Sequence, residues 1–108
     1  MTVHDHWIAG ASHRPASGKR LTRLSPADGH ELASVANGDG ADVDAAVAAA
    51  RKEFDSGRWR NLGGSQRGII LTKLADIMEE RIDEISRLEA EEAGKPIAAA
   101  KAEIRYAS

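Results

Sequence analysis

The sequence predicts an α+β fold, in which a short β-hairpin region is followed by three or four α-helices. Two observations carry this prediction. Apolar residues in the second half recur at the three- and four-residue spacing of an amphipathic helix. The first third instead alternates short β-prone runs with glycine and proline turns. With 108 residues, the chain forms one domain at most.

The strongest helical signal lies in residues 65–96, where an apolar stripe faces a charged side. The stripe consists of Ile70, Leu71, Leu74, Ile77, Met78, Ile85 and Leu88. Gly94 can adopt the left-handed conformation that ends a helix, and Pro96 cannot continue one. The segment therefore predicts a helical hairpin or a bent helix with a sharp turn at Gly94-Lys95-Pro96.

Residues 7–36 predict the β-hairpin region, with two or three short antiparallel strands in the runs 7–10, 20–24 and 31–35. Residues 25–29, with an early proline and a late glycine, predict a reverse turn. Such a small sheet requires further elements to cover its apolar face.

A helix is predicted after Asp39, whose carboxylate can cap it and which is followed by Asp42 in the first turn. Gly57 is the expected end. One face is expected to pack against a neighbour and consists of Val43, Val47, Ala50 and Phe54. Trp59 is expected to be a buried anchor, with ligand stacking as the alternative. Residues 97–108 predict a further helix without a stop signal, so the natural element is expected to continue.

Composition excludes several classes of function. The 15 basic and 17 acidic residues give a net charge of −2 and are interspersed, which disfavours nucleic-acid binding. The absence of cysteine excludes disulfides and thiol nucleophiles from this chain. No apolar run reaches the ~20 residues that cross a bilayer, and we see no signal peptide. We therefore expect a cytoplasmic protein without membrane contact.

Candidate chemical groups are few. His4, Asp5 and His6 could form a small metal site, but residues 1–6 more simply form a flexible N-terminus. His13 and His30 are expected on the surface. Three acids are expected to form a solvated helix face and no catalytic pair: Glu89, Glu91 and Glu92. Three serines lack a partner histidine and are expected to be caps or surface hydroxyls: Ser65, Ser86 and Ser108.

Six motifs occur in one collinear order. They are residues 7–10 (Trp-Ile-Ala-Gly), 24–31 around the proline turn, 41–51 with Phe54 and Trp59, Arg67-Gly68, 74–81, and 88–89 through Gly94-Lys95-Pro96. In this order the chain resembles the amino-terminal stretch of the NAD(P)-dependent aldehyde dehydrogenase superfamily. Two departures concern turn and cap chemistry: Ser25 replaces the commoner asparagine, and Gly63-Gly64 replaces a serine-proline helix start.

The resemblance implies an oxidoreductase that converts an aldehyde to a carboxylic acid and passes a hydride to NAD or NADP. It implies that this chain is an α+β fragment of an α/β enzyme, with 39–108 an incomplete helical part of the cofactor-binding domain. The family's catalytic cysteine, its other catalytic groups and its cofactor loop lie beyond residue 108. No catalytic or cofactor-binding residue is therefore expected here, and no cofactor should bind this chain alone.

The expected partner is the remainder of the dehydrogenase polypeptide, and the chain alone should be inactive. Incomplete helix faces also predict self-association into a homo-oligomer, most simply a two-fold dimer. The alternative is a free-standing helical interaction module that uses the faces at 69–74 and 97–104.

The resemblance also implies a structural monovalent cation site, which maps to the carbonyl of Leu24 and the carboxylate of Glu92. The alternative is that Glu92 is an ordinary surface acid. If the site exists, Glu92→Gln should abolish any stabilisation by sodium or potassium, because a neutral amide holds a cation less well. Thermal unfolding with and without each salt measures this, with Glu91→Gln as control. An unchanged salt effect in Glu92→Gln would contradict the site.

Overall fold

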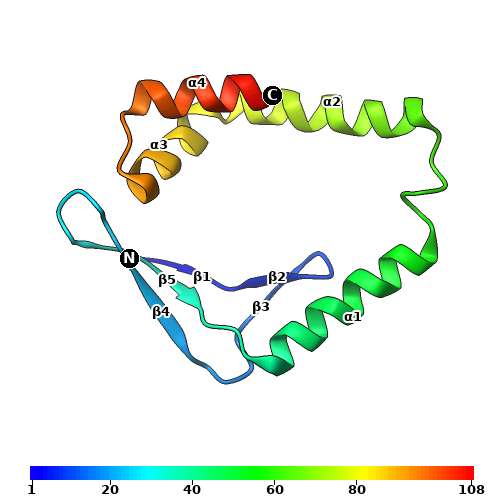
Figure 1. The fold of residues 1–108 in the computed structure, drawn as a ribbon, viewed down its shortest axis with the longest axis horizontal. Coiled ribbons are helices and arrows are strands. Elements are labelled where there is room, and N and C mark those ends of the chain that lie inside the picture. The colour runs from blue at the N-terminus through cyan, green and yellow to red at the C-terminus, as the bar shows by residue number, and fades with distance from the viewer. The chain divides into compact units, whose positions relative to one another are not determined.

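The computed structural model describes all 108 residues, which form five strands and four helices (Figure 1). The chain divides into two compact units. Unit 1 contains residues 1–24 and 31–61, and unit 2 contains residues 25–30 and 62–108. Short strands followed by helices confirm the predicted α+β class.

Unit 1 contains every strand. They are β1 (Thr2–His4), β2 (His6–Ile8), β3 (Ala11–His13), β4 (Arg20–Leu24) and β5 (Glu31–Ala36). β4 and β5 pair antiparallel, as the sequence predicts, and β1 pairs in parallel with the other edge of β5. β2 and β3 form a separate antiparallel hairpin.

The strands differ from the prediction in number and direction. We expected two or three antiparallel strands and a flexible segment 1–6, whereas five strands form and β1 lies within that segment. The three residues of β1 are exposed, and a run of three is too short for its polar and apolar alternation to mark a strand. Their position is set by backbone pairing with the free edge of β5, which the sequence pattern does not encode.

Helix α1 (Gly40–Ser56) begins and ends where the sequence predicts. The Asp39 carboxylate accepts hydrogen bonds from the backbone N–H groups of Ala41 and Asp42, at 3.0 and 3.4 Å. The Asp42 carboxylate accepts the N–H of Asp39 at 3.1 Å, which completes a capping box. Gly57 ends the helix in the left-handed conformation, with φ of 71°.

The expected packing of α1 was wrong. The face that we expected to be covered is exposed: Val43 (57%), Val47 (61%) and Phe54 (58%). Trp59 is also 45% exposed instead of being a buried anchor. Because α1 contacts β2 through the neighbouring face that carries Asp42, its valine and phenylalanine positions point elsewhere.

Unit 2 combines one turn with three helices, α2 (Gly64–Glu80), α3 (Ile82–Ala93) and α4 (Ile97–Ala107). The predicted reverse turn is confirmed, since the N–H of Gly29 donates to the carbonyl of Ser25 at 2.8 Å. The N–H of Ser25 donates to His30 O at the same distance. Gly29 has φ of 78°, the positive angle that its position in the turn requires.

Residues 65–96 form two helices, and the interruption lies at Arg81. This residue ends α2 and precedes α3 with φ of −104° and ψ of 18°. The N–H of Arg81 still donates to Ile77 O at 3.1 Å, so the chain leaves the helix without glycine or proline. Asp83 and Glu84 then occupy the first turn of α3, where negative charge favours a new helix start.

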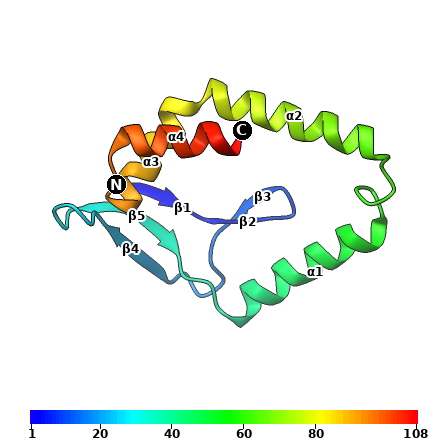
Figure 2. The same ribbon diagram turned by 45° about the horizontal axis from the view of Figure 1, so that its top comes forward.

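The α3–α4 hairpin forms the best buried part of unit 2 (Figure 2). Ser86 and Ala100 are fully buried, because small side chains allow the two helices to approach closely. Gly94 makes the predicted sharp turn with φ of 66°. Lys95 then joins the helices, with Nζ 2.8 Å from Glu89 and 2.7 Å from Glu103. These carboxylates raise the pKa of Lys95, with Glu103 the larger cause.

The apolar stripe of α2 is exposed, although α4 lies beside this helix (Figure 2). The exposed fractions in the predicted stripe are 48% for Ile70, 56% for Leu71, 53% for Leu74 and 39% for Ile77, while Met78 is half-buried. The periodicity correctly predicts the helix, but no element of unit 2 covers this face.

Gly94→Ala should destabilise unit 2. A Cβ there would lie 2.9 Å from Pro26 Cγ, and the left-handed backbone disfavours an L side chain by about 1–2 kcal/mol. The matched control is Gly68→Ala inside α2, where a Cβ has nothing within 4 Å. That control should stabilise by about 0.5–1 kcal/mol. Urea denaturation measures both, and equal stability of Gly94→Ala and the unchanged chain would contradict this account.

Candidate functional site

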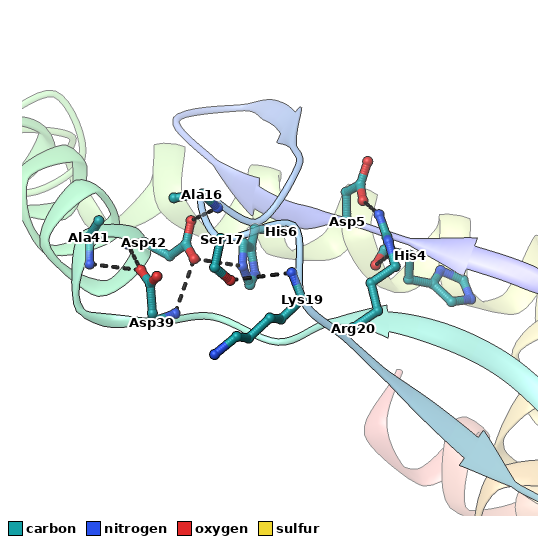
Figure 3. Close-up of polar contacts among 10 residues, drawn as sticks. All are labelled: His4, Asp5, His6, Ala16, Ser17, Lys19, Arg20, Asp39, Ala41 and Asp42. Atoms are coloured by element: carbon teal, nitrogen blue, oxygen red, sulfur yellow. Dashed lines mark hydrogen bonds and ion pairs between the residues drawn. The ribbon is translucent and has the colours of Figure 1, made fainter.

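The best-built polar cluster of unit 1 surrounds the first turn of α1 and is called the Asp42 cluster here. It consists of His6, Ala16, Asp39 and Asp42 (Figure 3). Asp42 Oδ1 accepts the backbone N–H of Ala16 at 2.9 Å, and Oδ2 accepts that of Asp39 at 3.1 Å. One buried carboxylate therefore connects the loop after β3 to the start of α1.

The environment of Asp42 stabilises its charged form. The N–H of Ala16 lowers the pKa of Asp42 most, followed by the N–H of Asp39, while partial burial opposes the change. His6 also lowers this pKa through its charge when it is protonated. The carboxylate is consequently kept ionised at neutral pH.

His6 reaches the same carboxylate from β2. Its Nε2 lies 3.6 Å from Asp42 Oδ2 and is buried without a hydrogen-bond partner. Gly38 lies against the ring, because a Cβ built there would be 3.1 Å from His6 Cε1. The ring is therefore held in place by packing, with its nitrogen directed at the carboxylate.

The alternative of a metal site formed by His4, Asp5 and His6 is not supported, because their side chains are not brought together. Asp5 pairs with the guanidinium of Arg20, which also donates to the carbonyl of His4 at 3.2 Å (Figure 3). His6 faces Asp42 instead. No group of three or more histidine, cysteine, aspartate or glutamate side chains in the structure could hold a metal ion.

The other candidate residues, His13, His30 and Ser86, are either exposed or bonded to neighbouring groups. His13 and His30 are exposed, as expected, and His30 Nδ1 lies 2.6 Å from the Asp28 carboxylate. Hydrogen bonds from Ser25 and His30 lower the pKa of Asp28 to about 2, with Ser25 the larger cause. Ser86 corrects one expectation: it is buried and donates to Ile82 O at 2.5 Å, so it is neither a cap nor a surface hydroxyl.

Among the acids on α3, Glu91 and Glu92 are exposed and Glu89 pairs with Lys95. The suggested cation ligands lie in different units, since Leu24 ends β4 in unit 1 and Glu92 belongs to unit 2. The cation site stays a prediction.

No helix combines the length and the apolar character that a membrane crossing requires.

The contacts of the Asp42 cluster thus hold the loop after β3 against the start of α1, within a fold that is an α+β fragment. A sequence model of the aldehyde dehydrogenase family matches residues 13–108. The chain belongs to this family and corresponds to an amino-terminal segment of its members, which confirms the resemblance.

Individual proteins that are similar to this chain are also aldehyde dehydrogenases. A mitochondrial benzaldehyde dehydrogenase from Antirrhinum majus is 46% identical over 81 residues, which are 75% of this chain and 15% of that protein. The crystal structure of an NAD-dependent aldehyde dehydrogenase from Sinorhizobium meliloti has a TM-score of 0.90 at 37% identity. The match covers 96% of this chain and 21% of that enzyme's chain.

A betaine aldehyde dehydrogenase from Staphylococcus aureus, solved in complex with NAD+, has a TM-score of 0.89 at 26% identity. The match covers 94% of this chain and 20% of that one. The chain therefore spans about a fifth, or less, of the length of these relatives.

The stability of unit 1 should depend on pH through Asp42. Because the folded pKa of Asp42 is lowered, its contribution is present above the ordinary value of 3.8 and is lost as pH falls through the folded pKa. Asp42→Asn should remove this component, while Asp44→Asn, on the exposed side of α1, should retain it. Urea midpoints measured across acidic pH test this. An acid transition that is the same in Asp42→Asn and the unchanged chain would contradict it.

Proposed function

We propose that this chain is the structural amino-terminal portion of an NAD(P)-dependent aldehyde dehydrogenase that oxidises an aldehyde to a carboxylic acid. In this proposal the remainder of the dehydrogenase polypeptide supplies the catalytic cysteine and the cofactor loop. The chain supplies the first strands and the helices that pack on the cofactor-binding domain. Alone it is catalytically inactive.

The observation that carries the proposal is the amount of apolar helix surface that the chain leaves uncovered. Val43 and Val47 on α1, and Leu71 and Leu74 on α2, are each more than half exposed. Isolated apolar residues on a surface are ordinary, but a periodic stripe along a helix marks a face that packs against another element. The remainder of the polypeptide is the partner that family membership provides.

The cofactor of the complete enzyme is proposed from a relative. The Staphylococcus aureus relative was solved with NAD+, and this supports NAD as the cofactor of the complete enzyme, with NADP as the alternative. In this chain, no glycine-rich phosphate loop follows a strand and opens a helix. The segment 39–108 is therefore proposed as an incomplete part of the cofactor-binding domain that binds no cofactor alone.

Assembly and location belong to the same proposal. The uncovered faces of α1 and α2 support association of the chain with further polypeptide, including copies of itself in a homo-oligomer. Location in the cytoplasm stays a prediction of the sequence analysis.

Fragment complementation tests the proposal. The Sinorhizobium meliloti enzyme, expressed without its matched amino-terminal segment, should be inactive, and co-expression with this chain should restore aldehyde-dependent NADH formation. Val47→Asp should reduce the restored activity at least tenfold, because it places a charge on the packing face. Lys52→Asp is the control, since this residue lies on the opposite side of α1 at 100° per residue.

Circular dichroism should show equal helicity for the two variants before mixing, because both positions are exposed. Restoration by the unchanged chain and by Lys52→Asp, but not by Val47→Asp, is the expected result. Equal restoration by all three chains would show that the uncovered face of α1 is not an interface. The absence of restoration by any chain would contradict the proposal.

A further inference from the structure

The proposed function leaves one partly buried titratable side chain unused, which is His6 with 22% of its side chain exposed. Its Nε2 is inaccessible to water and has no hydrogen-bond partner, and it lies 3.6 Å from Asp42 Oδ2. The Asp42 side chain is only 10% exposed. A buried nitrogen without a hydrogen-bond partner costs free energy of folding and calls for an explanation.

Protonation of the imidazole changes this contact. A neutral ring at 3.6 Å is just outside hydrogen-bond distance, and its attraction to the carboxylate is weak. A protonated ring carries a positive charge and two N–H donors, so it forms a charge-assisted contact with a carboxylate that is largely shielded from water. Among the side chains, histidine changes charge in this way closest to neutral pH.

We propose that His6 and Asp42 form a proton-operated latch between β2 and the first turn of α1. When His6 is protonated, the ring is drawn to Asp42 Oδ2 and β2 is held against the helix. Because the same carboxylate accepts the N–H groups of Ala16 and Asp39, closing the latch also tightens the loop after β3 and the helix cap. When His6 is neutral, the hairpin of β2 and β3 is held less firmly.

The latch requires a negative charge facing the protonated ring, and the charged groups around His6 meet this requirement. From α1 the ring meets the Asp42 carboxylate, while the Asp39 carboxylate is occupied by N–H groups of the first turn. His13 is directly opposite His6 on β3 and is exposed, so water screens its charge. From β4, Arg20 is engaged by Asp5 and by the carbonyl of His4.

Lys19 precedes β4, and its side chain extends away from the imidazole in the view of Figure 3. The charge in contact with the ring is therefore negative, and the latch closes when His6 is protonated. In stronger acid the latch opens again, because Asp42 becomes protonated. Its pKa is lowered by the N–H groups of Ala16 and Asp39, which keeps this second opening well separated from the first.

Nuclear magnetic resonance of the isotopically labelled chain tests the latch without unfolding it. The readouts are the His6 Cε1 proton and the Ala16 amide, which donates to Asp42 Oδ1. Between about pH 5 and about pH 8, the Ala16 amide shift should follow the same titration curve as the His6 ring. After correction for intrinsic exchange, protection of the Ala16 amide should be several-fold higher on the acidic side.

His6→Gln should abolish the pH dependence at Ala16, and His13→Gln should preserve it, since that residue is the exposed cross-strand neighbour. The latch is overturned if the Ala16 amide shows no inflection where His6 titrates, or if the inflection survives in His6→Gln. If His6→Gln does not fold, the titration of the unchanged chain decides alone, because both resonances belong to one protein. The result is independent of the complementation experiment, which tests the Val47 face of α1 and not the contact between His6 and Asp42.

Discussion

The rest of this structure depends on one constraint, which is that its helices carry more apolar surface than the chain itself can bury. Among the aliphatic and aromatic residues only Ala33 and Ala100 are buried, whereas Val43 and Val47 on α1 and Leu71 and Leu74 on α2 are more than half exposed. Apolar burial is the main favourable term in folding, at about 25 cal/mol per Å². A chain that leaves these faces in water therefore forgoes much of the free energy that its own sequence could provide. The relatives are about five times longer, which supports the proposal that further polypeptide covers these faces.

Each unit is held together instead by a few polar contacts and by close packing of small residues. In unit 1, the Asp42 carboxylate joins the loop after β3, the helix cap and the neighbourhood of His6. In unit 2, the α3–α4 hairpin relies on close approach at Ser86 and Ala100 and on the two carboxylates around Lys95. Exposed ion pairs contribute little individually, about 0–1 kcal/mol. Such contacts specify geometry more than they supply stability, which suits a segment that is completed by further packing.

The sequence predicted those features that arise from local chemistry. Asp39 and Gly57 bound α1, and Gly94 turns the chain, because caps and left-handed glycines act within one helical turn. The interruption at Arg81 was missed, since neither glycine nor proline marks it. The acidic pair after Arg81 was the available signal. Burial of Trp59 and of the α1 face was predicted wrongly, because periodicity shows which face is apolar and not whether the chain provides its cover.

The Asp42 cluster shows the same difference between features set by local sequence and features set by distant contacts. Asp42 was predicted as a charge in the first turn, which is a local role, and this was correct. Its contacts with Ala16 and His6 come from segments 26 and 36 residues away in sequence (42 − 16 and 42 − 6). No spacing rule connects such distant positions, so the cluster could be found only in the folded chain. His6 had been grouped with a flexible terminus for that reason.

The central claim is that the uncovered helix faces form an interface with the remainder of a dehydrogenase. The most direct measurement is the heat-capacity change when this chain binds the Sinorhizobium meliloti enzyme that lacks its matched segment, obtained from calorimetry at several temperatures. Burial of apolar surface gives a negative heat-capacity change. The account predicts a large negative value that becomes smaller in Val47→Asp. A value near zero, or one that Val47→Asp leaves unchanged, would contradict it.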